Sequence, residues 1–133
     1  MIVLCPSCWA TVTLRAPRCA QCGEDLEVLD QRHYAEKLQR ALDHPDRETV
    51  MRVANVLADR SEPESAGALV RALRSHWQEP YVAAAIVSAL GHLDANSAWD
   101  AVHEALGHES FIVRKAAALA LQQGRPDVAR RER

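Results

Sequence analysis

The sequence predicts a mostly α-helical protein in which three helix pairs stack as an α-solenoid behind a small β module. Three observations support this fold class: all four cysteines lie within the first 22 residues, two helical patterns recur every 31 to 33 residues, and turn-forming residues separate the helices. The 133 residues are 48% hydrophobic and 26% charged, as is typical of a folded globular protein.

The N-terminal module carries two closely spaced cysteine pairs. They are Cys5 with Cys8 and Cys19 with Cys22, with ten residues between the pairs. Two residues between cysteines allow a tight turn to direct both thiolates at one ion, and two such turns complete a tetrahedral site. "WATVTL" alternates like a short hairpin strand. We therefore expect one Zn²⁺ bound by all four cysteines, while disulfides are the alternative chemistry.

This motif resembles a zinc ribbon over residues 1–30. The resemblance implies a structural zinc, because four protein ligands leave no open position for a catalytic water. The sequence departs from the commonest pattern in having Trp9 rather than glycine after Cys8, so we expect the first turn to differ in detail.

Two helical patterns each occur three times in the remaining chain. "KLQRALDH", "ALVRALRSH" and "AVHEALGH" align Leu42 with Leu73 and Leu106. "TVMRVANVLA", "VAAAIVSALG" and "VRKAAALALQ" align Thr49 with Val82 and Val113. Two helices per repeat, repeated three times, predict an α-solenoid.

The second helix of each pair is similar to the second helix of HEAT repeats, in particular the short HEAT-like repeats named after phycobilin lyases. "VAAAIVSALGHL" and "VRKAAALAL" carry this resemblance over about residues 33–123, and the first repeat is degenerate. The resemblance implies a scaffold with the first helices on its convex side and the second helices on its concave side. The expected domains are a zinc ribbon at 1–30, a HEAT-like repeat domain at 31–123 and a basic C-terminal tail at 124–133.

Helical geometry predicts which side chains of the second helices face the concave side. Counting from the aligned Thr49, Val82 and Val113, we expect steps 2, 5, 6 and 9 to point outward. These positions hold Met51, Ala54, Asn55, Ala58, Ala84, Val87, Ser88, Gly91, Lys115, Ala118, Leu119 and Gln122. Most of them lack a polar side chain, so the sequence predicts an apolar concave surface.

We expect this surface to bind a partner protein or a second copy of the chain. Its expected contact residues are Met51, Asn55, Ala84, Val87, Ser88, Lys115 and Leu119, with Trp77 in a turn as a further binding anchor. The alternative is that small side chains only permit tight curvature, or that the zinc ribbon folds back over them.

Four histidines, His44, His76, His92 and His108, fall at expected helix C-termini. There an imidazole can interact with the terminal carbonyls and the helix dipole, so these histidines are expected to be structural. The His-Glu pairs at His103 and His108 do not match the placement found in HEAT-type iron hydroxylases.

The charge pattern argues against specific nucleic-acid binding. The net charge is −2, and residues 1–30 hold two arginines against four carboxylates. The nearest thing to a basic block is "RRER" at Arg130 to Arg133, whereas nucleic-acid binders usually show a basic face.

No segment predicts a signal peptide or a membrane span, so we expect a cytoplasmic protein without membrane contact. Fourteen of the 16 basic residues are arginine, which hints at a bacterial genome rich in G and C.

The function expected from the sequence is that of a non-enzymatic protein-interaction module, a small adaptor or regulator. Its partner binds the apolar concave face, and the zinc ribbon serves as a second docking element. Two alternatives remain: a nucleic-acid-associated zinc-ribbon protein, and a HEAT-type bilin lyase or hydroxylase.

Overall fold

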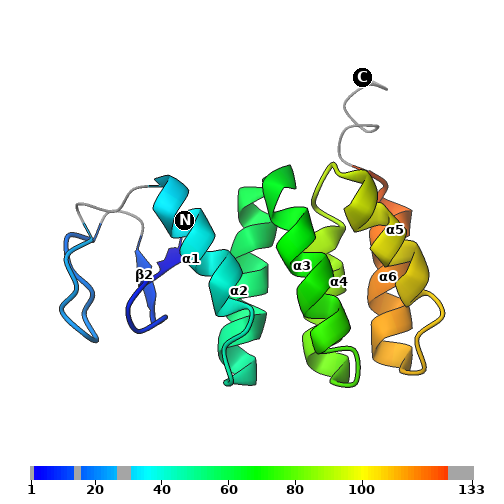
Figure 1. Ribbon diagram of the computed structural model, residues 1–133, viewed down its shortest axis with the longest axis horizontal. Coiled ribbons are helices and arrows are strands. Elements are labelled where there is room, and N and C mark those ends of the chain that lie inside the picture. Colours follow the sequence, from blue (N-terminus) through cyan, green and yellow to red (C-terminus); the bar gives the residue numbers. More distant parts are fainter. Residues whose placement is uncertain (1, 14–15, 27–30, 126–133) are drawn as a thin grey trace.

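The computed structural model describes residues 2–13, 16–26 and 31–125 (Figure 1). Within them, two short strands precede six α-helices and one 3₁₀ turn. The strands are β1 (Ile2–Leu4) and β2 (Thr11–Thr13). The helices are α1 (Gln31–Ala41), α2 (Arg47–Arg60), η1 (Pro63–Ser65), α3 (Ala66–Ser75), α4 (Pro80–Leu90), α5 (Asn96–Ala105) and α6 (Phe111–Gln123). The basic residues Arg130 to Arg133 lie outside the described residues.

Residues at the N-terminal ends of α2, α4 and α6 favour the start of a helix there. The side chain of Asp46 accepts a hydrogen bond from the backbone N–H of Thr49 and caps α2. Ser110 caps α6 in the same way through the N–H of Ile112. Pro80 occupies the first turn of α4, where its missing N–H costs nothing.

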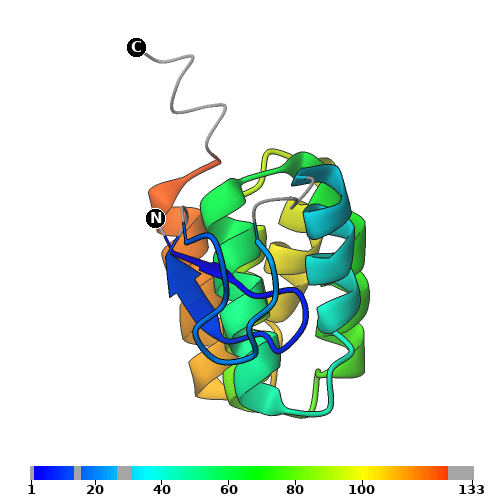
Figure 2. The same cartoon turned by 90° about the vertical axis from the view of Figure 1, so that its left-hand side faces the viewer.

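The helices form two layers (Figures 1 and 2). One layer contains α1, α3 and α5, and the other, which we call the second-helix layer, contains α2, α4 and α6. Each helix packs against its partner in the pair and against the equivalent helix of the next pair. The expected order of three helix pairs is therefore present in a mostly helical fold.

Helix α4 is apolar on nearly every side because it lies in the middle of this arrangement. It packs against α2, α3, α5 and α6. Its residues Val82, Ala83, Ile86 and Val87 are all at most 1% exposed. The core of the helical part is continuous along the row, and α4 supplies its centre.

Small residues bring α4 and α6 close together. A Cβ atom added at Gly91 would lie 2.8 Å from the Cβ of Ala120, closer than two such atoms approach. Glycine at this position is thus required by the neighbouring helix, since its own backbone is an ordinary right-handed one (φ −65°).

The predicted outward set is wrong at three positions. Ala54, Ala58 and Val87 are buried, with Val87 at 0% exposure. Steps 5 and 9 of the second helices face the next repeat, which buries Ala54, Ala58 and Val87 and leaves Gly91 half-buried against Ala120. The equivalent Ala118 is exposed because α6 ends the described row. Val87 is therefore a core residue, and the prediction that it contacts a partner is wrong.

The N-terminal residues form what we call the cysteine module, residues 2–26, at the end of the row next to α1 and α2 (Figure 2). Its two strands pair antiparallel, with Leu4 opposite Thr11. The backbone N–H of Leu4 donates to the Tyr34 hydroxyl at 2.7 Å, and Tyr34 is 1% exposed. The module thus continues the core of the helices at the end of the row.

None of the helices in the described ranges is long and apolar enough to cross a membrane.

Candidate metal centre and interaction surface

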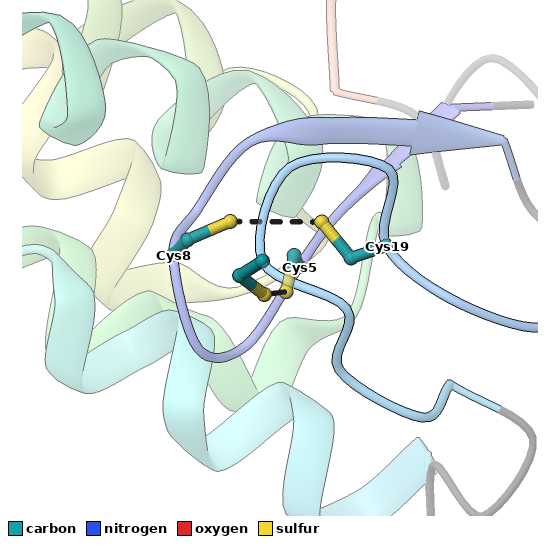
Figure 3. A group of neighbouring side chains, drawn as sticks. Cys5, Cys8 and Cys19 are labelled. Atoms are coloured by element: carbon teal, nitrogen blue, oxygen red, sulfur yellow. Dashed lines mark hydrogen bonds between the residues drawn. The ribbon is translucent and has the colours of Figure 1, made fainter.

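The four cysteines come together as the sequence predicts. All four Sγ atoms lie within 4.8 Å of one another. The Sγ atoms of Cys8 and Cys19 are 3.6 Å apart and point toward each other (Figure 3), and Cys5 and Cys22 are separated by the same distance. A disulfide needs sulfurs about 2.05 Å apart, and all four thiols are free. The cluster has the ligands and the spacing to hold a metal ion.

The two turns that carry the cysteines share one backbone pattern. In the first, the N–H of Trp9 donates to the carbonyl of Cys5 at 2.8 Å, and the N–H of Cys5 donates to the carbonyl of Ala10 at 2.9 Å. In the second, Gly23 donates to Cys19 and Cys19 donates to Glu24 at equivalent distances, 2.9 and 3.0 Å. The first turn, despite having Trp9 in place of glycine, therefore makes the same backbone hydrogen bonds as the turn that contains Gly23.

Trp9 has a left-handed backbone like that of Gly23, which occupies the equivalent position in the second turn. Its φ is +61°, beside +80° at Gly23. A left-handed backbone costs a residue with a Cβ atom about 1–2 kcal/mol relative to the right-handed one. The Trp9 side chain is half-buried and packs against the core cluster, which offsets part of this cost.

Backbone N–H groups point at the sulfurs and alter their acidity. The N–H of Cys22 hydrogen-bonds the Cys19 sulfur and, with a weaker contribution from Gln21, lowers the pKa of Cys19 to about 7. The N–H of Glu24 acts to lower the pKa of Cys22, but desolvation and the three neighbouring thiols outweigh it and raise that pKa to about 12.

The pKa of Cys8 is raised as well. The N–H of Ala10 and the thiol of Cys22 act against this change, but desolvation and the hydrogen bonds with Cys19 and Cys5 outweigh them. Crowded thiols resist ionisation because each thiolate repels the next, and a bound cation would remove that repulsion.

Several predicted partner-binding residues lie on the surface of the second-helix layer. Asn55, Ser88, Lys115 and Leu119 are exposed, and Leu119 is 47% exposed. Met51 and Ala84 are half-buried. The prediction of an outward face thus holds at steps 2 and 6 of the repeat.

Two aromatic residues on the same layer lie near repeat junctions, where the sequence favours a packing role. Tyr81 and Phe111 are each 67% exposed at the N-terminal ends of α4 and α6. Tyr81 lies seven residues before Ser88, so both are on one helix face. The expectation that these two aromatic rings pack at the junctions is therefore wrong.

Trp77 lies in the turn between α3 and α4, as expected, but its ring is half-buried and packed. The ring centroids of Trp77 and His108 are 4.4 Å apart, with the planes tilted by 48°. Trp77 therefore contributes to the junction between two repeats, and its indole is only partly available to a partner.

Two of the four histidines contact a carbonyl in the preceding repeat, which the sequence does not predict. His92 contacts the carbonyl of Ser88 on its own helix at 2.9 Å, in agreement with the prediction. His76 Nε2, in contrast, contacts the carbonyl of Leu42 in the preceding repeat at 3.1 Å, and His108 Nε2 contacts that of Trp77 at 2.7 Å. Interaction with the carbonyls of their own helices is thus wrong for His76 and His108, because the turn of the preceding repeat lies within reach.

Comparison with family models gives one match. Residues 76–130 match the family model for HEAT repeats. The matched segment includes α4, α5 and α6, that is, the second helix of the second pair and both helices of the third pair. Comparisons with curated proteins and with solved structures give no match.

Proposed function

We propose that this protein is a non-enzymatic protein-interaction module, a small adaptor whose helix pairs form a HEAT-like α-solenoid. HEAT repeats are commonly protein-interaction modules, and three of the six described helices, α4, α5 and α6, lie in the matching segment. The observation that carries the proposal is the set of exposed apolar side chains on the second-helix layer: Tyr81, Phe111 and Leu119.

The partner contacts one side of that layer. Tyr81 and Ser88 share a face of α4, and the aligned positions on α2 and α6 place Asn55 and Leu119 beside it. Covering Tyr81 and Leu119 at about 1.5–3 kcal/mol each contributes roughly 3–6 kcal/mol before the costs of association. That is enough for a modest interface supported by its polar rim. Phe111, seven residues before Ala118, extends the apolar surface to the end of the row.

The cysteine module is proposed to hold one zinc ion in a structural role. Four thiolates at about 2.3 Å from a zinc ion, at tetrahedral angles, lie about 3.8 Å from one another. The observed 3.6 Å separations fit this spacing. With four protein ligands the ion has no free position, so it would stabilise the module and take no part in a reaction.

The test compares charge substitutions on the two layers. Leu119→Glu combined with Phe111→Ser disrupts the proposed surface, and Leu106→Glu is the matched control because Leu106 is also exposed, at 40%, just after α5 in the other layer. Cross-linking mass spectrometry on lysates of the native cells identifies bound proteins, and sedimentation analysis measures self-association.

We expect the double variant to lose its partners or its dimerisation while Leu106→Glu retains them. Zinc content and helical circular dichroism should be unchanged in both. If the double variant keeps all of its partners and its solution mass, the second-helix layer is not the binding surface.

A further inference from the structure

The histidines in the turns between paired helices occupy equivalent places along the row. His44, His76 and His108 each lie in the turn that joins the first helix of a pair to the second. Nε2 of His76 and of His108 each contacts a backbone carbonyl in the turn of the preceding repeat. This position in the fold is therefore one from which an imidazole reaches a carbonyl of the neighbouring unit.

The first member of the series has the same orientation but a different neighbour. The N–H of Ser110 donates to Nδ1 of His108 at 2.8 Å, which leaves the hydrogen on Nε2. The N–H of Asp46 donates to Nδ1 of His44 at 3.0 Å, so His44 Nε2 is likewise the donor. In the part of the chain that the structure describes, His44 Nε2 has no carbonyl acceptor, because no repeat precedes it.

A surface hollow lies beside His44, between the cysteine module and α1. We call it the junction hollow; its volume is about 360 Å³. Its lining includes Pro6, Trp9, Lys37, Arg40, Asp43 and His44. Two apolar rings from the module thus face two basic side chains of α1, with a single carboxylate among the lining residues.

We propose that the junction hollow docks an extended, acidic segment of a partner protein. A backbone carbonyl of that segment accepts a hydrogen bond from His44 Nε2, as the turns of the first and second repeats do for His76 and His108. An apolar side chain of the segment packs on Trp9 and Pro6, and its carboxylates pair with Lys37 and Arg40. The inference rests on the proposal that the chain binds proteins, and it names a second surface, separate from the second-helix layer.

The tryptophan at position 9 fits this assignment, since its ring both packs against the core cluster and lines the hollow. The other turn places glycine at the equivalent position, where the left-handed backbone has no steric cost. A large aromatic side chain there is costly for the turn, yet it supplies an apolar wall of the hollow. The metal site does not need it.

A nucleic acid fits the hollow less well than an acidic peptide. Asp43 lies in the hollow itself, and the cysteine module that forms one wall of the hollow carries the exposed carboxylates of Glu24 and Asp25. A continuous polyphosphate chain would run against these carboxylates, whereas a short peptide places its charges only at the basic pair.

The experiment selects peptides from a random 12-residue phage-displayed library on the full-length, zinc-loaded protein. Enriched peptides are synthesised with a fluorescent label, and their affinities are measured by anisotropy for wild type and three variants. Trp9→Gly removes the apolar wall and retains a residue that the turn accepts. Lys37→Glu with Arg40→Glu reverses the basic pair, and Arg71→Glu with Arg74→Glu makes the same charge change on α3, outside the hollow. Native mass spectrometry verifies one metal ion in each variant.

We expect the enriched peptides to be acidic, with at least tenfold weaker binding to Trp9→Gly and to the α1 double variant and unchanged binding to the α3 double variant. Enrichment of basic peptides, equal binding by all variants, or no enrichment overturns the proposal. A fluorescent 12-nucleotide single strand is tested in the same way. If it binds wild type more tightly than the peptides and loses binding in the same two variants, the ligand of the junction hollow is a nucleic acid and not a peptide. Neither result depends on Leu119 or Phe111, so failure here is distinct from failure of the second-helix surface.

Discussion

The imidazole of His108 lies against the indole of Trp77 and donates from Nε2 to the carbonyl of that same residue at 2.7 Å. His108 is 6% exposed, so this hydrogen bond lies in an almost dry junction between the second and third helix pairs. Replacing it by an apolar residue leaves the Trp77 carbonyl without its partner.

We predict that His108→Leu lowers the free energy of unfolding by about 1–3 kcal/mol, the cost of leaving a buried polar group unsatisfied. Urea titration followed by circular dichroism measures this change. His103→Leu is the control, because His103 is exposed on α5 and should change stability by less than about 0.5 kcal/mol. Equal stability of the two variants would contradict the role assigned to His108.

Gly91→Ala should destabilise the protein even though alanine is the better helix former. The added Cβ would lie 2.8 Å from the Cβ of Ala120, so α4 and α6 must separate, at a cost of about 1–3 kcal/mol. Gly107→Ala is the matched control, since its Cβ would lie at an ordinary 3.6 Å from the carbonyl of Glu104. Thermal unfolding of both variants measures the difference, and a neutral Gly91→Ala would show that the helices are not in close contact.

Zinc binding should release protons and weaken in acid. The raised pKa values of Cys8 and Cys22 leave both thiols protonated at pH 7, so zinc uptake displaces at least two protons. The apparent affinity is then expected to fall at least a hundredfold for each pH unit below 7, and more steeply as Cys19, with a pKa of about 7, also becomes protonated. Calorimetry in buffers of different ionisation enthalpy counts the protons released. Fewer than two protons per zinc would contradict this prediction.

Cys19→Ser should abolish binding of the single ion and unfold the cysteine module. Most of the helical circular dichroism should remain, because repeats contact mainly their neighbours. A wild-type protein that is metal-free after preparation without chelators would rule out the zinc site itself.

Tyr34→Phe should loosen the contact between the module and the helices. The phenylalanine ring fills the same space, but the buried N–H of Leu4 loses its acceptor, at a cost of about 1–3 kcal/mol. Amide hydrogen exchange at Leu4 is expected to accelerate while exchange in α4 is unchanged. Tyr81→Phe, on an exposed tyrosine, is the control and should leave both rates as they are.

Periodicity and spacing predicted the larger part of this structure. The repeated patterns placed the helices in the right order, and the two cysteine pairs met as their spacing implied. Both signals are local, because a turn or a helix face depends on residues close together in the chain.

The errors came from contacts between repeats. A helical count places Val87 on an outer face of α4, but only the neighbouring α6 determines that this face is covered. The same limitation applies to His76 and His108, whose acceptors are 34 and 31 residues away in the chain. The left-handed backbone of Trp9 was not predicted, because the hydrogen bonds of the turn that carries Cys5 and Cys8 override the preference of the residue.

The histidine bonds between repeats also tie the second edge of the row. Both lie at the edge where the first helix of each pair turns into the second, along the lower side of Figure 1. The chain itself joins successive pairs at the opposite edge, through residues 61–65 and 91–95. Splaying adjacent pairs at the histidine edge must break a directed hydrogen bond, so the spacing between repeats is restrained at both ends of the helices.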